Sequence, residues 1–396
     1  MLKQILAITA MNVRSIPERW GPSLVIVIGL AGVVAVFTAL LAMANGFSST
    51  LQSAGRAENA IVLRGQSGAE LNSGFGGDSV RLIQLGPGIR KDADGRPLAA
   101  GEMMVITELQ KKNDPDPQAV ANVTLRGVEA ASFAIRPQLR ITSGRRFESG
   151  KREVVVGAGI ARQFAGTGLG DTLRMRGSDW TVVGHFEAGD ANDSEIWVDL
   201  GTAQSSFNRG NGVSSVRVAL ESPAAIETLR AALAADPRLA VDVTAEQAYY
   251  SAQTKGVRQT IEALAFVITL IMGLGAIFAA LNTMYAAVSA RTREIATLRA
   301  IGFGGLPVMA SVMVEAVLLS LVGGIVGAVA AYLLFNGLSV STLSQASFTQ
   351  VVFEFAVTPS LVLTGLVIAM AIGFVGGLLP AVRAARMQVT TALRTQ

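Results

Sequence analysis

Four long apolar stretches constrain the fold of this chain more than any other feature of its sequence. They cover residues 22–45, 258–290, 306–335 and 358–382. A helix rises about 1.5 Å per residue, so about 20 residues cross the hydrocarbon core of a bilayer, which is about 30 Å thick. Each stretch is long enough to cross, and we predict four transmembrane helices.

The first stretch contains no charged residue and follows residues 1–21. Apolar side chains at helical spacing in 1–21 predict a short helix in the cytoplasmic interface, although an ordinary packed surface helix fits the same spacing. Ala42, Met43 and Ala44 resemble a signal-peptide cleavage site. The apolar run is, however, much longer than the h-region of about 7–15 residues, so we predict a retained span.

Basic residues indicate the orientation of the spans. Three arginines stand within nine residues from 291 to 299, and three more lie in the tail 383–396, whereas 336–357 has neither Lys nor Arg. Lys and Arg beside spans face the cytoplasm. We therefore predict that both termini and the segment 291–305 are cytoplasmic, and that 46–257 and 336–357 are extracytoplasmic.

Residues 46–257 predict a large α+β extracytoplasmic domain, with one or two lobes, between the first and second spans. Short apolar runs such as 153–156 and 180–184 predict strands, and 158–164 and 223–235 predict helices. Stretches rich in Gly, Asp and Pro, at 65–80 and 86–97, predict mobile loops.

The isoelectric point near 9.6 suggests nucleic-acid binding, but the location of the charges argues against it. Residues 46–258 hold 24 basic and 24 acidic residues, so the net charge of +4 belongs entirely to the segments around the spans. Such an excess reports topology and lipid contact. We predict no nucleic-acid partner.

The second span is predicted to be part of a much longer helix. No proline occurs from Ala245 to Ala290, which allows one helix of 46 residues, or about 69 Å. Thr244 and Gln247 match a capping box at its start. Gly256, Gly273 and Gly275 are the positions where the helix could bend.

Sequence motifs of catalysis are missing. The chain has no cysteine and contains no GxxxxGK[ST], HExxH or GxSxG pattern, so we predict no catalytic, cofactor or metal site. His185, the one histidine, stands in a strand-like run, which favours a structural role.

Two sets of acidic residues need separate interpretation. Asp190, Asn192, Asp193 and Glu195 lack the spacing of a calcium loop, which favours a solvated loop over a cation site. Glu315 lies about two turns into the third predicted span. It either marks a substrate route or pairs with an arginine of the basic segment, and we favour the pairing.

Small residues at GxxxG spacing predict close helix packing in lipid. They are Gly323 and Gly327 in the third span, and Gly373 and Gly377 in the fourth. The motif serves dimerisation or packing within one chain equally well.

Several segments resemble one family, the FtsX-like, MacB-type permeases of ABC transporters, which include the membrane subunits of macrolide exporters and lipoprotein-release systems. The resemblance is strong from residue 289 onward and rests on Arg291, 293–295, 298–302, 315–316, 323–327, 380–381, 383–385 and 392–394. Residues 143–147 and 154–157 resemble the outer domain's porter region.

The resemblance implies a subunit that relays motion rather than an enzyme. A separate ATPase subunit would bind ATP and Mg²⁺, and the segment 291–302 would be the coupling helix seated in it. The residues implied in this coupling are Arg291, Arg293, Glu294, Leu298, Arg299 and Gly302. Mechanotransmission would then export or extract an amphiphilic, lipid-like or periplasmic substrate across the bacterial inner membrane.

Partners and alternatives also follow from the resemblance. It implies a second permease copy, identical or paralogous, and leaves room for a periplasmic adaptor or a lipoprotein-binding partner. One alternative is a non-transporting regulator that activates an extracytoplasmic partner such as a cell-wall hydrolase. A membrane-tethered receptor without an ATPase is the other, but it leaves the basic segment before the third span unexplained.

Overall fold

The computed structural model describes residue 11 and residues 20–112, 114–116, 119–344 and 347–387. The predicted interfacial helix at 1–21 and the tail beyond 387 therefore lie almost wholly outside the described residues. The chain divides into two compact units. The membrane unit comprises 1–45, 259–338 and 355–396, and the outer unit comprises 46–258 and 339–354.

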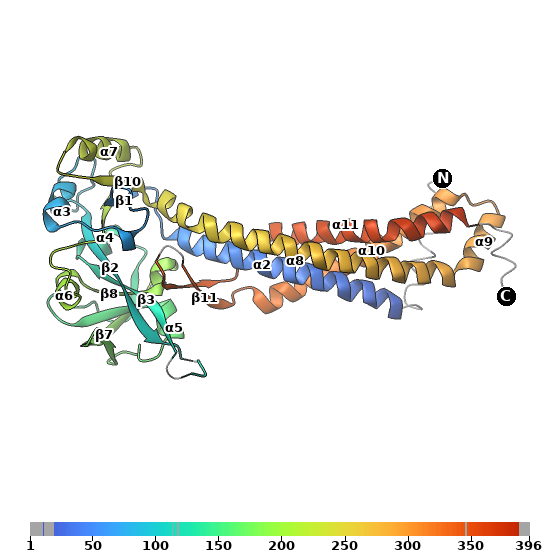
Figure 1. Cartoon of the computed structure of the whole chain (residues 1–396), viewed down its shortest axis with the longest axis horizontal. Helices are drawn as coiled ribbons and strands as arrows, with labels where there is room; N and C mark the ends of the chain where they lie inside the picture. The colour runs from blue at the N-terminus through green and yellow to red at the C-terminus, as the bar shows by residue number, and fades with distance from the viewer. Residues whose placement is uncertain (1–10, 12–19, 113, 117–118, 345–346, 388–396) are drawn as a thin grey trace. The chain divides into compact units, whose positions relative to one another are not determined.

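Among the described residues, four helices are long and apolar enough to cross a membrane, as predicted. They are α2 (Trp20–Ser53), α8 (Glu246–Ala290), α10 (Gly305–Phe335) and α11 (Pro359–Arg386). Figure 1 shows them running side by side. Helix α2 continues past residue 45, the predicted end of the first span, and runs through Gly46 to Ser53.

Helix α8 is a single uninterrupted helix of 45 residues. The predicted helix of 245–290 is therefore confirmed to within one residue, and none of the three glycines breaks it. Gly273 faces Ile372 of α11, where a Cβ would only reach van der Waals contact. The helix is thus longer than any bilayer core requires.

The GxxxG glycines pack helices of the same chain against one another. A Cβ at Gly323 would lie 2.8 Å from the carbonyl oxygen of Val27 on α2. A Cβ at Gly327 would collide with the carbonyl oxygen of Ala31, also on α2. Gly377 of α11 leaves room for Ala316 of α10, whose Cβ would be 2.6 Å away. Of the two predicted roles, the structure shows packing within the chain.

The outer unit is built on a sheet of ten strands among the described residues. The strand order is β10-β1-β9-β2-β3-β8-β5-β7-β4, with β6 paired to β7. Two pairs, β3 with β8 and β5 with β7, are parallel, and the others are antiparallel. The strands are β1 (Asn59–Arg64), β2 (Ala99–Gln110), β3 (Val120–Val128), β4 (Arg140–Gly144), β5 (Glu153–Gly157), β6 (Thr172–Met175), β7 (Ser178–Glu187), β8 (Glu195–Asp199), β9 (Ser215–Ala219) and β10 (Val241–Ala245).

Short helices accompany this sheet, with an apolar core between them that includes Val156, Trp180 and Val198. The predicted helices at 158–164 and 223–235 are present as α5 and α7. The helices are η2 (Glu70–Asn72), α3 (Gly77–Gln84), α4 (Ala131–Ile135), α5 (Ala158–Gln163), η3 (Ala191–Ser194), α6 (Leu200–Ser206) and α7 (Ala225–Ala235). Within residues 65–80, predicted as a mobile loop, 70–72 form η2 and 77–80 belong to α3.

Residues 336–357, predicted only as a short extracytoplasmic connection, form a β-hairpin. Strands β11 (Ser339–Leu343) and β12 (Gln350–Glu354) pair with each other and belong to the outer unit. The amide of Val352 donates to Ser194 Oγ at 2.8 Å, and the hydroxyls of Thr124 and Thr349 lie 2.8 Å apart. The hairpin is therefore seated on β3 and η3.

The glycine contacts predict the effect of Gly327→Ala. Alanine normally stabilises a helix by about 0.5–1 kcal/mol relative to glycine. At Gly327 its methyl group would meet a backbone atom, and such overpacking costs about 1–3 kcal/mol. We expect Gly327→Ala to lower the thermal unfolding midpoint in detergent. Gly275→Ala is the matched control, because nothing lies within 4 Å of its Cβ position, and equal midpoints for both variants would contradict the packing role.

Candidate functional site

The basic segment forms helix α9 (Thr292–Ala300), which is amphipathic. Ile295 and Ala296 are buried in the core of the membrane unit, whereas Arg293 and Glu294 are exposed. Gly302 ends the segment with φ of +102°, a conformation that side chains with a Cβ rarely adopt. The helix thus exposes a charged face, while its apolar face packs against the rest of the membrane unit.

Arg291 and Arg299 tie α9 to the rest of the membrane unit. The side chain of Arg291 is 7% exposed, and its Nη1 lies 3.3 Å from Glu315 Oε2 on α10. The predicted pairing of Glu315 with an arginine of this segment is confirmed. Arg299, which is half-buried like Leu298, donates from Nη1 to the carbonyl oxygen of Met387. Of the predicted coupling residues, Arg293 and Glu294 are therefore the charged ones exposed on α9.

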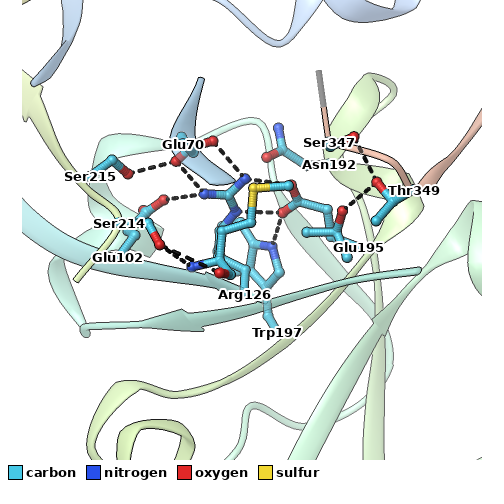
Figure 2. Close-up of polar contacts among 12 residues, drawn as sticks. Glu70, Glu102, Arg126, Asn192, Glu195, Trp197, Ser214, Ser215, Ser347 and Thr349 are labelled. Carbon is cyan, nitrogen blue, oxygen red and sulfur yellow. Dashed lines mark hydrogen bonds and ion pairs between the residues drawn. The ribbon is translucent and has the colours of Figure 1, made fainter. Parts of the chain in front are cut away.

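A second group of charges lies buried in the outer unit and centres on Arg126 of β3 (Figure 2). Its Nε and Nη2 donate to the two carboxylate oxygens of Glu195, each at 2.7 Å. Nη1 and Nη2 also donate to Glu70, at 2.8 and 3.1 Å. Trp197 donates its Nε1 to Glu195 at 2.7 Å. The guanidinium is thus saturated by side chains from several elements.

Two further arginines extend this group into a charge cluster. Arg136 donates to both oxygens of Glu102, at 2.6 and 2.9 Å, and Glu102 also accepts from Arg126 at 3.1 Å. Arg217 of β9 donates to Glu70 at 3.1 Å and pairs with Glu246. The cluster comprises Glu70, Glu102, Arg126, Arg136, Glu195, Arg217 and Glu246, all buried.

Glu246 connects the charge cluster to the start of α8, because it is the first residue of that helix. Besides Arg217, its carboxylate accepts from Asn59 Nδ2 at 3.1 Å and from the amide of Arg56 at 3.2 Å. Gly55 brings this segment close, since a Cβ there would lie 2.8 Å from Cα of Gln247. The first turn of α8 is therefore fixed to β9 and to the chain that follows α2.

Burial and charge act in opposite directions on the cluster's carboxylates. Burial alone raises the pKa of a carboxyl group, because it penalises the charged form. For Glu102 the guanidinium groups of Arg136 and Arg126 outweigh burial and lower the pKa to about 2. For Glu70, Arg126 and Arg217 outweigh burial and hold the pKa well below its usual range. Both carboxylates therefore remain charged at neutral pH.

The residues considered as a solvated loop are instead buried. Asp190, Asn192 and Asp193 form or cap η3, and Glu195 belongs to the charge cluster. Backbone amides of residues 188 and 189 donate to Asp193 at 2.6 and 2.9 Å. Among the described residues, no group of three or more His, Cys, Asp or Glu could hold a metal ion. The solvated-loop prediction is wrong, because these side chains cap and anchor a turn.

His185 is fully engaged in hydrogen bonds. Its Nδ1 lies 2.9 Å from Ser143 Oγ, and its Nε2 lies 2.6 Å from the carbonyl oxygen of Thr167. The ring therefore bridges β4 and the loop after α5, which fits the predicted structural role.

Most of the charge cluster was missed by sequence reasoning. One pattern in the sequence could have revealed part of it, namely a single charge inside an apolar strand. Glu102, Arg126 and Arg217 each stand among apolar neighbours. A charge at such a position needs a buried partner. Glu70, in a stretch rich in glycine and serine, gave no such indication.

The burial of the cluster predicts the cost of truncating Arg217. Removing one partner of a buried pair destabilises a protein by about 3–5 kcal/mol, because it leaves an unpaired charge. We expect Arg217→Met to lower the free energy of unfolding of the outer unit by that amount. Arg238→Met is the control, since Arg238 pairs with Asp236 but its side chain is 67% exposed, and exposed ion pairs contribute little to stability.

Urea titration followed by tryptophan fluorescence measures this difference. Trp180 and Trp197 are fully buried in the outer unit, and Trp20, which is 72% exposed, is replaced by phenylalanine in every sample. Equal losses in the two variants would show that Arg217 is not held by an essential ion pair.

The carboxyl groups also predict how the outer unit responds to pH. The lowered pKa of Glu102 gives stability above its ordinary value of 4.5 that is lost as pH falls towards 2. Burial raises the pKa of Asp193 to about 6 from 3.8, so its contribution is present below 3.8 and is lost as pH rises through 6. We expect the free energy of unfolding to rise from about pH 7 to about pH 5 and to fall below about pH 4.

Urea titrations across this range test both limbs of the pH profile. Asp193→Asn should flatten the rise and keep the acid limb, whereas Glu102→Gln should weaken the acid limb. A profile unchanged by either substitution would contradict the assignment.

Comparison with known proteins identifies two family domains in this chain. Residues 23–236 match the MacB-like periplasmic core domain, and residues 266–389 match the FtsX-like permease C-terminal domain. The first match alone covers more than half of the chain. Its limits include most of α2 and most of the outer sheet.

Individual relatives are distant. The macrolide export ATP-binding/permease protein MacB of Bordetella avium is 24% identical over 337 residues, which cover 77% of this chain and 50% of that protein. MacB 1 of Aeromonas hydrophila is 25% identical over 410 residues, covering 94% and 57%. The uncharacterized ABC transporter permease YvrN of Bacillus subtilis is 33% identical over 114 residues, covering 29% and 26%. The chain spans about half the length of the macrolide export relatives.

Two solved domains were also found by structural comparison. The extracellular domain of YknZ from Gram-positive bacteria gives a TM-score of 0.36 at 18% identity, covering 47% of this chain and 99% of that domain. The periplasmic region of MacB from Actinobacillus actinomycetemcomitans gives a TM-score of 0.36 at 15% identity, covering 52% and 92%.

Four apolar helices, an α+β domain between the first two of them and both family domains occur in the expected order. The chain therefore belongs to the MacB-like, FtsX-like family of ABC transporter permeases, multi-pass membrane proteins with an extracytoplasmic domain.

Proposed function

We propose that this chain relays motion from an ATPase on the cytoplasmic side of the bacterial inner membrane to its extracytoplasmic domain. In this proposal both termini are cytoplasmic, and the motion serves to export or extract an amphiphilic, lipid-like or periplasmic substrate. ATP and Mg²⁺ bind to a separate ATPase subunit, and a second permease copy completes the complex. A periplasmic adaptor would extend the same path outward.

The observation that carries the proposal is the unbroken helix α8 with a buried ion pair at its first residue. A helix hydrogen-bonds internally along its whole length, so it resists stretching and sharp bending unless a proline, a bulge or an inserted group interrupts it. Helix α8 runs without interruption from Glu246 to Ala290. A displacement of its inner end is therefore carried to Glu246.

The charge cluster then distributes that displacement over the sheet. Glu246 pairs with Arg217 on β9, and Arg217 donates to Glu70, which also holds Arg126 on β3. Separating any of these buried charges is strongly unfavourable because water does not replace the lost partner. Strands β9 and β3 therefore follow Glu246 rather than slide past it.

The composition of the spans supports a relay instead of a hydrophilic channel. Within the four predicted spans, only Arg258, Glu262 and Glu315 carry a charged side chain, and Glu315 is paired with Arg291. Ion and proton routes through a membrane are usually marked by ionisable residues along the path. We infer that substrate is handled by the extracytoplasmic domain or taken from the outer leaflet.

Charge reversal at Arg293 tests contact with the ATPase. Arg293 is exposed on α9, so Arg293→Glu should reduce co-purification of the partner ATPase by about tenfold or more, the equivalent of about 1.4 kcal/mol. Arg238→Glu in the outer unit is the control and should leave it unchanged. Membrane fractionation should show equal insertion of both variants.

Two outcomes would oppose the proposal. Full co-purification of the ATPase with Arg293→Glu would show that this side chain is not part of the interface. Absence of any associated ATPase with the parent chain would favour a membrane-tethered receptor.

A further inference from the structure

We propose that Arg291 is a positioning residue that transfers the displacement of α9 to α8 and α10 through its buried ion pair with Glu315. This inference rests on the proposed function and adds a role distinct from ATPase contact. Arg293 would bind the partner, whereas Arg291 would fix the orientation in which α9 meets it.

Arg291 lies at the corner where the chain turns from α8 into α9. It is the single residue between Ala290, which ends α8, and Thr292, which begins α9. Its backbone departs from helical geometry, with φ of −105° and ψ of 13°. Its amide donates to Val288 O of α8 at 3.2 Å, and its carbonyl accepts from Ile295 of α9 at 3.0 Å. A side chain anchored at this corner controls the angle between the two helices.

The guanidinium of Arg291 connects three helices. Its Nη1 lies 3.3 Å from Glu315 Oε2 on α10, and its Nε lies 3.1 Å from Glu294 Oε2 on α9. Glu315 is 9% exposed and Glu294 is 51% exposed. One planar group therefore joins a buried anchor on α10 to the exposed face of α9, which the proposed function places against the ATPase.

The surroundings of the ion pair make it hard to separate. A cavity of about 20 Å³ beside it is lined mainly by apolar side chains of α8, α9 and α10, including Met284, Val288, Ile295, Val308 and Val312. An unpaired charge in such surroundings is strongly unfavourable, so the two partners move together. Rotation of α9 against α10 then requires breaking the pair, whereas motion of the three helices as one body does not.

Lysine cannot reproduce this arrangement. Arg291 contacts the two carboxylates with different nitrogen atoms, Nη1 and Nε. A lysine ammonium is a single point charge on a flexible stem and lacks the rigid fork of the guanidinium. Arg291→Lys therefore keeps the charge and removes the geometry, which separates positioning from electrostatic attraction.

The test uses the full chain together with its ATPase, reconstituted in lipid nanodiscs. The variants are Arg291→Lys, Glu315→Gln and the exchange of Arg291→Glu with Glu315→Arg. Three quantities are measured on the same samples: co-purified ATPase, the ATP hydrolysis rate relative to the ATPase alone, and the thermal unfolding midpoint. Arg238→Met, in the outer unit and 67% exposed, is the control variant.

We expect the two single variants to retain ATPase co-purification within about twofold and to lose about tenfold or more of the permease-dependent change in hydrolysis. This loss should occur at temperatures where the protein remains folded. The exchanged pair should recover part of the change, because it restores opposite charges at the same two positions, and Arg238→Met should behave as the parent chain.

Two results would overturn the inference. Loss of ATPase co-purification with Arg291→Lys would make Arg291 a binding or folding residue instead. Unchanged hydrolysis in both single variants would show that the ion pair does not position α9. Failure of the proposed function itself is distinguishable, because the parent chain would then associate with no ATPase.

Discussion

The ion pair between Glu246 and Arg217 is the interaction on which the rest of the structure depends. It joins the first residue of α8 to strand β9 of the outer sheet, and both side chains are fully buried. Buried pairs seldom add much stability compared with apolar packing, and their attested use is to specify one arrangement among several. Here the specified arrangement is the register of a long helix against β9, with the same carboxylate also fixing Asn59 and the amide of Arg56.

A second buried ion pair lies just after the other end of α8, between Arg291 and Glu315. Between the two, the helix is mostly apolar and packs into the core of the membrane unit through side chains such as Ala280 and Met284. Specific charged contacts are therefore concentrated where α8 meets other elements, and generic apolar contacts fill the bilayer. This division suits a part that must move as one body in lipid, because lipid-facing apolar side chains impose no register of their own.

The sequence was informative wherever one physical requirement dominates. Bilayer thickness dictates the length of apolar runs, so α10 was predicted to within one residue at its start, and the lack of proline predicted the extent of α8. A carboxylate inside a span needs a partner, which predicted the pairing of Glu315. Contacts between segments far apart in the chain produce no comparable pattern in the sequence. Glu70 reaches Arg126 across 56 positions, and no local pattern encodes such a distance. The hairpin at 339–354 was missed because its short strands lie in a connection that was considered only for its charge.

That hairpin has a consequence for how the extracytoplasmic domain can be regarded as a module. The chain enters or leaves the outer unit four times, at 45/46, 258/259, 338/339 and 354/355. A fragment cut at 46–258 would expose the hydroxyls of Thr124 and Ser194 and the ring of Phe47, which Thr349 and β12 otherwise contact. The domain is thus a composite of two separate insertions. Exchange of the large insertion between homologues would succeed only when the small one between the third and fourth spans is exchanged with it.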